Sequence, residues 1–374
     1  MALPFGTVPS GARNAPTPFK ASIPDERIKE MQILVRLSKI APETYEGSQQ
    51  DRKYGITTEW LSSAKDQWKK LDCFPQFTYK IEGLTIHFVA LFSEKKDAVP
   101  IVLLHGWPGS FLEFLPLLSL FRDKYDPSTL PYHFVVPSLP GYTFSSGPPL
   151  DKNFSTADVA RIINQLMVNL GFESGYVAQG GDIGSRIGRV LAVDYESCKG
   201  TYWTFQDQTF WTSHANEDFN INSGTFMEHG TRPSTIGHVL AASPIALLAW
   251  IGEKFLDWVD DPLPLETILE SVSLYWLTET FPRSIYPYRE FLQPSEVPAT
   301  MDPRWYIRKP FGFSYFPMEL VPVPRSWIET TGNLVFWRQH EKGGHFAALE
   351  RPQDFAEDLA AFVQQIWPGI SQRK

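Results

Sequence analysis

The residues whose types could do chemistry begin with an aspartate held between glycines. Asp182 lies in the run Gly180-Gly181-Asp182-Ile183-Gly184, which follows an apolar stretch and precedes a helix-like one. This pattern is typical of a nucleophile elbow, a strained strand-to-helix turn in which glycines allow close backbone packing. A serine here would predict an ester-cleaving enzyme. A carboxylate instead predicts attack on an sp³ carbon, with a covalent ester between substrate and enzyme.

A second motif could stabilise the negative charge that develops during such chemistry. Residues 105–107 read His-Gly-Trp and follow the apolar run 101–104. A His-Gly loop after a buried strand supplies a backbone N–H to an oxyanion hole in hydrolases of this architecture. We therefore expect the amides of Trp107 and of Ile183, which directly follows the aspartate, to face one oxygen of Asp182.

A histidine and an acid complete the pattern. His345 lies in a Gly-Gly-His-Phe segment after the strand-like run 334–337 and is the candidate general base. Glu319 lies between Asp182 and His345 in the chain and is the candidate acid that orients the imidazole. The order nucleophile, acid, histidine is that of an α/β-hydrolase. Each residue alone has a commoner explanation as a turn, solvated or loop residue, and only their combination favours a hydrolase-type site.

With these motifs the chain resembles the epoxide hydrolases of the α/β-hydrolase superfamily, in particular the microsomal-type branch that includes soluble fungal enzymes. The resemblance runs from about residue 18 to the C-terminus and is strongest at residues 105–110, 137–142, 180–185, 231–233, 311–320 and 343–350. It implies that Asp182 is the nucleophile, that His345 activates water and that Glu319 orients His345. It also implies that one or two cap tyrosines hydrogen-bond the epoxide oxygen and that the product is a vicinal diol.

The second tyrosine of the family has a match in this chain. In the family this tyrosine precedes a basic residue and a glutamate, and here Tyr288 precedes Arg289 and Glu290. The resemblance therefore implies that Tyr288 donates a hydrogen bond to the epoxide oxygen, with Tyr286 as the alternative donor.

The first tyrosine of the family has no match. It lies six residues before the threonine of a Thr-Arg-Pro motif, and counting back from Thr231 gives Thr225, with Phe226 beside it. The stretch from the nucleophile to Thr231, and a second one after Trp68, are also shorter than in the fungal relatives. The part of the site that should donate a proton to the epoxide oxygen therefore departs further from the family pattern than the part around Asp182.

Apolar strand-like runs alternate with helical stretches, which predicts an α/β fold: a mostly parallel sheet with helices on both faces. We expect a loose arm over residues 1–22 and a first helix capped by Ser22. The strand pattern stops in the middle of the chain, where a hydrolase lid belongs. The expected divisions are an N-terminal arm and helical extension (1–72), a first core segment (73–205), a helical cap (206–308) and a second core segment (309–374).

Aromatic residues near the strand ends and the cap entrance could line a substrate pocket. The candidates are Tyr286, Phe144 and Trp203, with Trp107, Phe205 and Trp211 in similar positions. The alternative for each is packing in the core, because a chain with 14% aromatic residues needs many of them there.

Composition limits the partners. The 374 residues carry a net charge of −8, with a sequence pI near 5.6, which argues against nucleic acid and anionic membranes. Cys73, Cys198 and the eight histidines show no metal-ligand spacing, and no phosphate-binding glycine loop is present, so no cofactor and no metal are expected. The sequence has no signal-like segment and no apolar run of spanning length, which predicts a soluble cytoplasmic protein. Relatives suggest a homodimer.

Other functions remain open from the sequence. A haloalkane dehalogenase uses the same ester chemistry, but it would need halide-binding Trp or Asn donors beside the nucleophile instead of a cap tyrosine. A biosynthetic epoxide-opening cyclase fits the missing first tyrosine. A non-catalytic binding module is disfavoured, because it would need none of Asp182, Glu319 and His345.

Overall fold

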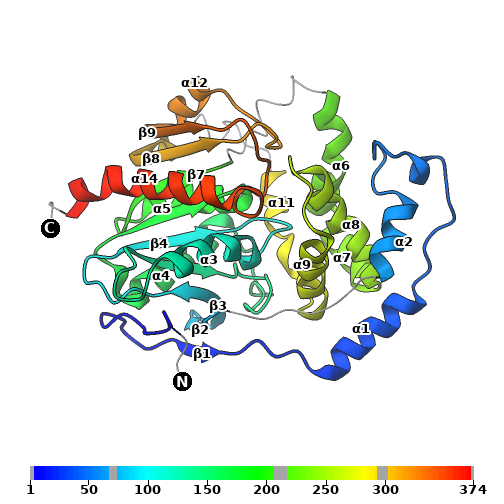
Figure 1. Ribbon diagram of the computed structural model, residues 1–374, viewed down its shortest axis with the longest axis horizontal. Coiled ribbons are helices and arrows are strands. Elements are labelled where there is room, and N and C mark those ends of the chain that lie inside the picture. Colours follow the sequence, from blue (N-terminus) through cyan, green and yellow to red (C-terminus); the bar gives the residue numbers. More distant parts are fainter. Residues whose placement is uncertain (1–3, 67–73, 206–216, 293–301, 372–374) are drawn as a thin grey trace.

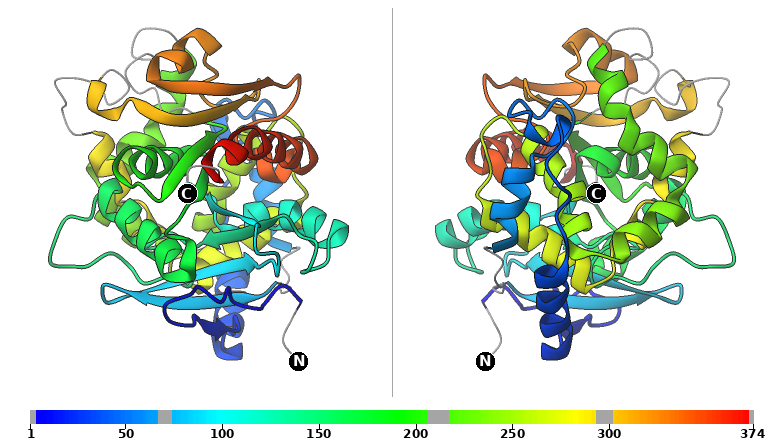
Figure 2. Two further views of the ribbon diagram at one scale, coloured as in Figure 1. Left: turned by 90° about the vertical axis from the view of Figure 1, so that its left-hand side faces the viewer. Right: turned by 90° about the vertical axis from the view of Figure 1, so that its right-hand side faces the viewer.

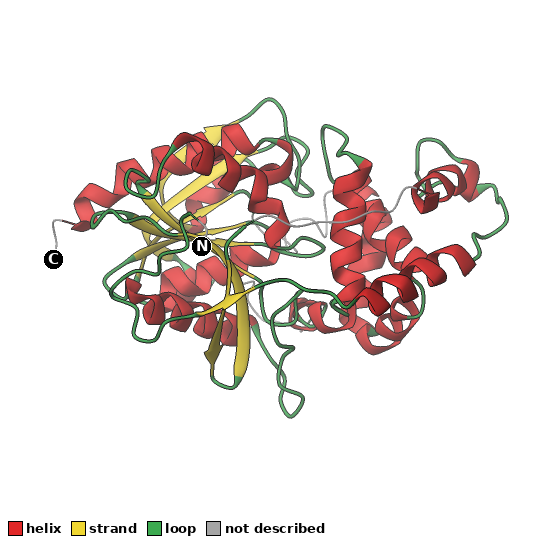
Figure 3. Cartoon of the chain, turned by 60° about the horizontal axis from the view of Figure 1, so that its bottom comes forward, coloured by secondary structure: helices red, strands yellow, loops and turns green. Residues whose placement is uncertain are grey.

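The computed structural model describes residues 4–66, 74–205, 217–292 and 302–371. Within these residues the chain forms a central twisted sheet flanked by helices, and a lobe of helices lies beside it (Figures 1 and 3). The sheet has the order β1-β2-β3-β5-β4-β6-β7-β8-β9. Its strands are β1 (Thr17–Phe19), β2 (Gln76–Ile81), β3 (Leu84–Leu91), β4 (Val99–Leu104), β5 (Tyr132–Pro137), β6 (Tyr176–Gly180), β7 (Cys198–Trp203), β8 (Ile307–Tyr315) and β9 (Gly332–Gln339).

The central strands are parallel and buried on both faces. Neighbouring strands from β5 through β4, β6, β7 and β8 to β9 pair in parallel, whereas β1, β2, β3 and β5 pair antiparallel. Every residue of β4, β5 and β6 is buried, as their near-continuous apolar sequences require. The carboxyl ends of the parallel strands therefore meet at one edge, where ligands bind in open α/β sheets.

Two hydrophobic cores lie on opposite faces of the sheet. Ile101 and Leu103 of β4 belong to one core, and Val102 and Leu104 belong to the other, because side chains alternate along a strand. The first face is covered by α3 (Leu115–Lys124) and α14 (Pro352–Ser371), the second by α4 (Thr156–Met167) and α5 (Asp182–Asp194). Short elements complete the core: η2 (Phe111–Phe114), η3 (Val168–Phe172), η5 (Pro303–Trp305), α12 (Arg325–Ile328), η6 (Glu329–Thr331) and α13 (Ala347–Glu350).

The described part of the expected cap is helical. Its elements are α6 (Glu217–Thr231), α7 (Pro233–Ala241), α8 (Pro244–Asp257), α9 (Leu265–Leu277), α10 (Phe281–Ser284) and α11 (Pro287–Phe291). All of them lie inside the predicted cap, and β8 begins just before its expected end. Figure 1 shows α6 to α9 gathered on one side of the sheet.

The N-terminal helices pack against this cap. The helices α1 (Asp25–Leu37) and α2 (Thr58–Asp66), with η1 (Glu46–Ser48) between them, pack against the cap helices α8 and α9. Arg52 Nε donates to Asp257 Oδ1 at 2.8 Å, and Arg27 Nη2 donates to Glu279 Oε1 at 2.9 Å. Figure 2 shows both blue helices beside the cap.

The expectation of a loose N-terminal arm is wrong. Strand β1 adds to the edge of β2, and the buried Phe5 accepts a backbone hydrogen bond from Phe92 at 2.9 Å. Strand β1 is held because it pairs with the otherwise unpaired edge of β2, and the segment before it is held by burial of the Phe5 side chain. Ser22 is also not the helix cap. The N-cap of α1 is Pro24, with no side-chain cap bond.

Membrane-spanning potential is low in the described residues. No single helix there is long and apolar enough to cross a bilayer. The pair α7 and α8 passes on length and composition only when taken together, and it is bent by 118°.

Candidate active site

Asp182 sits in a strained turn between β6 and α5. Its backbone adopts a positive φ of 47°, a conformation that costs energy for any residue with a Cβ. The neighbouring glycines are required by close packing. A Cβ at Gly184 would lie 2.2 Å from the Leu104 carbonyl oxygen, and a Cβ at Gly106 would lie 2.1 Å from Asp182 Oδ1. The predicted nucleophile elbow is therefore present, and it projects the carboxylate beyond the sheet.

The loop after β4 supplies an amide to this carboxylate. Leu104 pairs with Gly180 in the parallel register, so the loops that follow β4 and β6 lie side by side. The Trp107 N–H donates to Asp182 Oδ1 at 2.9 Å. Ile183 lies in the first turn of α5, where amides have no intrahelical acceptor. The Trp107 contact is observed, and the contribution of Ile183 stays a prediction.

His105 holds the amide-bearing loop in place. Its ring is fully buried, with Nδ1 3.0 Å from the Gly106 oxygen and Nε2 accepting from the Leu139 N–H at 3.1 Å. Burial lowers its pKa to about 4, so the ring is neutral at neutral pH. This histidine therefore positions the loop and takes no part in proton transfer.

The structure brings Glu319 and His345 to Asp182. Glu319 Oε1 lies 2.7 Å from His345 Nδ1, and His345 Nε2 lies 3.6 Å from Asp182 Oδ2. Only 3% of the His345 side chain and 6% of the Glu319 side chain are exposed, so water screens this pair weakly. The two loops that follow β8 and β9 carry the residues, and they are joined by backbone pairing of Met318 with Gly344.

The electrostatics of the triad favour a charged imidazole in the free protein. Burial by itself would lower the pKa of His345, but the charge and hydrogen bond of Glu319, followed by the charge of Asp182, outweigh burial and raise it to about 9. Burial raises the pKa of Glu319, and the charge of His345 opposes that rise. At neutral pH the resting site therefore contains an imidazolium between carboxyl groups.

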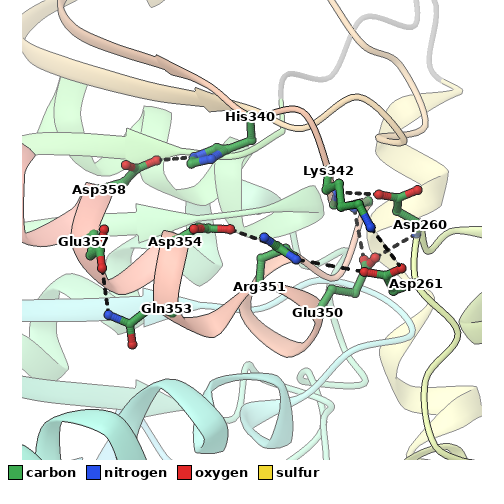
Figure 4. A network of polar contacts seen from close by, with 12 residues as sticks. Asp260, Asp261, His340, Lys342, Glu350, Arg351, Gln353, Asp354, Glu357 and Asp358 are labelled. Atoms are coloured by element: carbon green, nitrogen blue, oxygen red, sulfur yellow. Dashed lines mark hydrogen bonds and ion pairs between the residues drawn. The ribbon is translucent and has the colours of Figure 1, made fainter.

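The histidine loop is tied to the cap by Glu350. Its Oε2 accepts from the Asp260 N–H at 2.7 Å and its Oε1 from the Gly344 N–H at 3.2 Å. The Gly343 N–H donates to Asp260 Oδ2 at 2.9 Å, and the His345 N–H donates to the Trp258 oxygen at 2.8 Å. Figure 4 shows Glu350 and Asp260 within a larger network of hydrogen bonds and ion pairs.

We predict that Glu350→Leu weakens both folding and turnover, because it leaves two backbone amides without acceptors. Unpaired buried amides of this kind cost about 1–3 kcal/mol each. Thermal unfolding and kcat measure the two effects, and Glu350→Gln, which keeps an acceptor oxygen, should lose less of both. A Glu350→Leu variant with the melting temperature and kcat of the parent would show that the loop is held otherwise.

Tyr288 lies in α11 within the aromatic shell around the site. Its ring centroid is 6.0 Å from that of Trp107, in an edge-to-face arrangement. Burial first, and then the charge of Asp182, raise the pKa of Tyr288 well above its ordinary value, so the phenol keeps its proton. Tyr286 is not a suitable alternative donor, because its hydroxyl donates to the Pro140 oxygen at 3.1 Å. It anchors the cap to the core instead.

The expectations for the pocket wall are partly wrong. Trp203 is a core residue, with Nε1 donating to Thr201 Oγ1 at 2.7 Å and its ring stacked under the Arg189 guanidinium. Phe144 packs in an aromatic cluster with Phe19 and His87, separate from the residues that line the catalytic cavity. Both side chains turn into apolar layers, which strand position alone does not reveal.

Phe205 is close to the catalytic centre, with its ring 5.7 Å from the His345 ring and perpendicular to it. Trp211 lies outside the described residues. An aromatic wall beside His345 is therefore present on one side.

Two aromatic rings lie near Thr225, the position to which the counting rule for the first tyrosine leads. Phe226 contacts Tyr288, with ring centroids 5.6 Å apart. His229, one turn further along α6, lies 4.8 Å from Tyr288 and 4.5 Å from Trp107 and is completely buried. Trp250 Nε1 donates to His229 Nε2 at 3.0 Å, which places the ring hydrogen on Nδ1. The sequence reasoning missed His229.

Two further polar residues at the site were also missed. Glu113 and Gln179 line a cavity that Asp182 and His345 also line. The signal for Glu113 was its isolation as a lone acid in the apolar run 111–114, directly after the loop that carries Trp107. Among the described residues, no group of three or more His, Cys, Asp or Glu side chains is arranged to hold a metal ion.

Comparison with known proteins identifies the family and the fold. Residues 16–114 match the family described as epoxide hydrolase N terminus, and residues 99–200 match the alpha/beta hydrolase fold. The solved structure of Aspergillus niger epoxide hydrolase is 57% identical, with a TM-score of 0.91, over 98% of this chain and 100% of that chain.

More distant relatives share the family. Juvenile hormone epoxide hydrolase from the silkworm Bombyx mori is 26% identical, with a TM-score of 0.82, over 96% of this chain and 95% of that chain. Epoxide hydrolase 1 of Oryctolagus cuniculus is 28% identical over 92% of this chain and 88% of that protein. The expected fold and family are thereby confirmed: this chain belongs to the epoxide hydrolases of the α/β-hydrolase fold.

Proposed function

We propose that this protein converts an epoxide to a vicinal diol through a covalent ester on Asp182. The observation that carries the proposal is the continuous chain from Glu319 through His345 to Asp182, with the Trp107 amide on the other oxygen of the nucleophile. A carboxylate nucleophile, a histidine base and an amide donor are the parts that ester formation and ester hydrolysis need.

Ring opening uses the two sides of the site. Asp182 Oδ2, which does not accept the Trp107 hydrogen bond, attacks an epoxide carbon as the carbon–oxygen bond of the ring breaks. Tyr288 transfers its phenolic proton to the departing oxygen, which stays attached to the substrate as a hydroxyl. The products of this step are the ester and a phenolate at Tyr288.

Ester hydrolysis uses His345. The imidazolium of the resting site first returns a proton to the Tyr288 phenolate, which restores the phenol. The neutral Nε2 then takes a proton from water, and the water oxygen attacks the Asp182 carbonyl carbon. The Trp107 N–H stabilises the oxyanion that forms on Oδ1. In the collapse of the tetrahedral intermediate the hydroxyl proton passes to the departing diol oxygen, which releases the diol and regenerates the carboxylate. The proton taken from water stays on His345 and restores the imidazolium of the resting site. Epoxide and water are consumed in equal amounts.

Ester formation itself prepares the base. The pKa of His345 in the free protein is about 9, partly because of the Asp182 charge, and that charge disappears when the ester forms. Losing a nearby negative charge lowers the pKa of an imidazole. We therefore expect the hydrolytic step to gain rate with rising pH around a pKa below about 9. Single-turnover rates against pH, compared with an NMR titration of free His345, measure the difference. Equal values would contradict the argument.

Removing the Tyr288 hydroxyl should slow ring opening more than ester hydrolysis. Tyr288→Phe keeps the ring that packs against Trp107 and removes only the proton donor, so we expect ester formation to slow by roughly 10²–10⁴-fold. Stopped-flow fluorescence separates the two steps. Tyr286→Phe is the matched control, since that hydroxyl faces Pro140. Unchanged ester formation in Tyr288→Phe would move the role to another donor.

The source of the added oxygen tests the proposal directly. A single turnover in ¹⁸O-labelled water should place the label in the Asp182 carboxylate and leave the diol unlabelled, because water attacks the ester carbonyl. Peptide and product mass spectrometry read the two sites. Label in the diol would mean direct attack by water on the epoxide and would contradict an ester.

Haloalkanes and hydroxy-epoxides belong in the same substrate panel, since halide release or cyclic ether formation would indicate a dehalogenase or a cyclase. We further propose a soluble cytoplasmic homodimer that acts in detoxification. The exposed Ile33 and Leu37 on α1 support an interface at the N-terminal helices. Cell fractionation and light scattering test the location and the dimer.

A further inference from the structure

A cavity beside the catalytic triad has the size and the lining of a water site. Its volume is about 20 Å³, and Asp182, His345, Glu113 and Gln179 line it. Roughly 10–15 Å³ is enough to hold one water, provided that polar groups surround it. The cavity is thus large enough for a single water molecule or little more.

Two oxygen atoms in this cavity need hydrogen-bond donors. Glu113 Oε1 and Gln179 Oε1 are buried, and neither has a hydrogen-bond partner among the described residues. Buried polar atoms rarely stay unpaired, so a ligand that offers hydrogens belongs here.

We propose that Glu113, together with Gln179, holds the water that hydrolyses the Asp182 ester. This inference rests on the proposed function. One hydrogen of the water is directed to His345 Nε2, and the other is donated to Glu113 Oε1 or Gln179 Oε1. The water oxygen then faces the carbonyl carbon of the ester. Only the hydrogen directed to His345 is transferred, and Glu113 neither gains nor loses a proton in the step.

The local backbone makes room for this carboxyl group. A Cβ at Gly109 would lie 1.8 Å from Glu113 Oε1. The Glu113 carboxyl group therefore occupies the space that a side chain at position 109 would need. The neighbours Phe111 and Phe114 are apolar and buried. An apolar side chain at position 113 would suit that packing better, because burying an incompletely paired polar group is costly.

Glu113 is also suited to water binding by its protonation. Burial, with a contribution from the Asp182 charge, raises its pKa to about 8, so it is mostly protonated at neutral pH. The neutral acid adds no further negative charge beside Asp182 and Glu319. It still offers an acceptor oxygen, as the amide of Gln179 does.

The test separates the two chemical steps in matched variants. Glu113→Met keeps the length of the side chain and removes the acceptor, whereas Glu113→Gln keeps it. Gln179→Leu removes the other acceptor, and Glu357→Met changes an exposed acid on α14 as a control. Stopped-flow and quenched-flow mass spectrometry measure ester formation and ester hydrolysis for each, and thermal unfolding confirms the fold.

We expect Glu113→Met to slow ester hydrolysis by roughly 10²-fold while ester formation changes by less than about threefold, so the ester accumulates. Glu113→Gln should recover most of the hydrolytic rate, and Gln179→Leu should lose a smaller part. Ester hydrolysis at the parental rate in both Glu113→Met and Gln179→Leu would overturn this inference and leave the proposed function intact. If the parent and His345→Gln never form an ester, the proposed function fails and the inference fails with it.

Discussion

Asp182→Asn should reduce turnover by about 10⁶-fold, the scale seen when a covalent nucleophile is removed. An amide oxygen is a far weaker nucleophile than a carboxylate, so no ester forms and the later steps have no substrate. Product formation over a long incubation, with enzyme in large amount, measures the residual rate.

The variant should keep the native fold, which makes the result interpretable. Asp182 adopts a positive φ of 47°, and asparagine tolerates that region nearly as well as aspartate does. The Trp107 N–H can still donate to the side-chain oxygen that replaces Oδ1. An intact thermal transition with turnover within about tenfold of the parent would show that Asp182 is not the nucleophile.

His345→Gln should uncouple the two steps. Ring opening needs only the ionised Asp182 and an acid on the cap, so ester formation persists. Hydrolysis loses its base and should slow by roughly 10²–10⁴-fold. The expected time course is one rapid equivalent of epoxide consumed per active site, followed by almost no diol.

Glu319→Gln is the matched control for this variant. It leaves His345 in place and removes the charge that orients Nδ1–H at 2.7 Å. Hydrolysis should therefore fall less than in His345→Gln, and the pKa of His345 should drop, because Glu319 raises it. Steady-state turnover of His345→Gln at the parental rate would remove His345 from the base role.

The sequence predicted the parts of the site that rest on local backbone geometry. The elbow at Asp182 needs glycines at fixed positions, because residues such as Gly184 pack directly against the backbone of Leu104. This requirement makes the elbow recognisable in the sequence. The loops that carry Trp107 and His345 follow strands whose continuous apolar sequences are equally distinctive. Sheet, elbow and chain order therefore followed from pattern alone.

The sequence could not show which way side chains turn after a strand ends. Trp203 and Phe144 have the right location in the chain for a pocket, and both pack into apolar layers instead. Glu113 was missed for the opposite reason. Nothing in the sequence indicates that this acid in a short apolar helix faces the catalytic cavity. Such positions are decided by tertiary packing, which motifs do not encode.

The cap was hardest to predict. The counting rule for the first tyrosine reaches Thr225, and only the folded chain reveals that Phe226 and His229 lie against Tyr288. The docked N-terminal arm was missed for a similar reason. Phe5 and β1 are stabilised by contacts with distant parts of the sheet and have almost no local signal.

The most direct measurement of the central claim is the intact mass of His345→Gln after brief exposure to aryl and alkyl epoxides, with Asp182→Asn treated in parallel. The account predicts a mass gain equal to one whole epoxide, located by peptide mapping to Asp182 and absent from Asp182→Asn. An adduct of the same mass on Asp182→Asn, or catalytic diol formation by the parent with no adduct on His345→Gln, would contradict the covalent aspartyl mechanism.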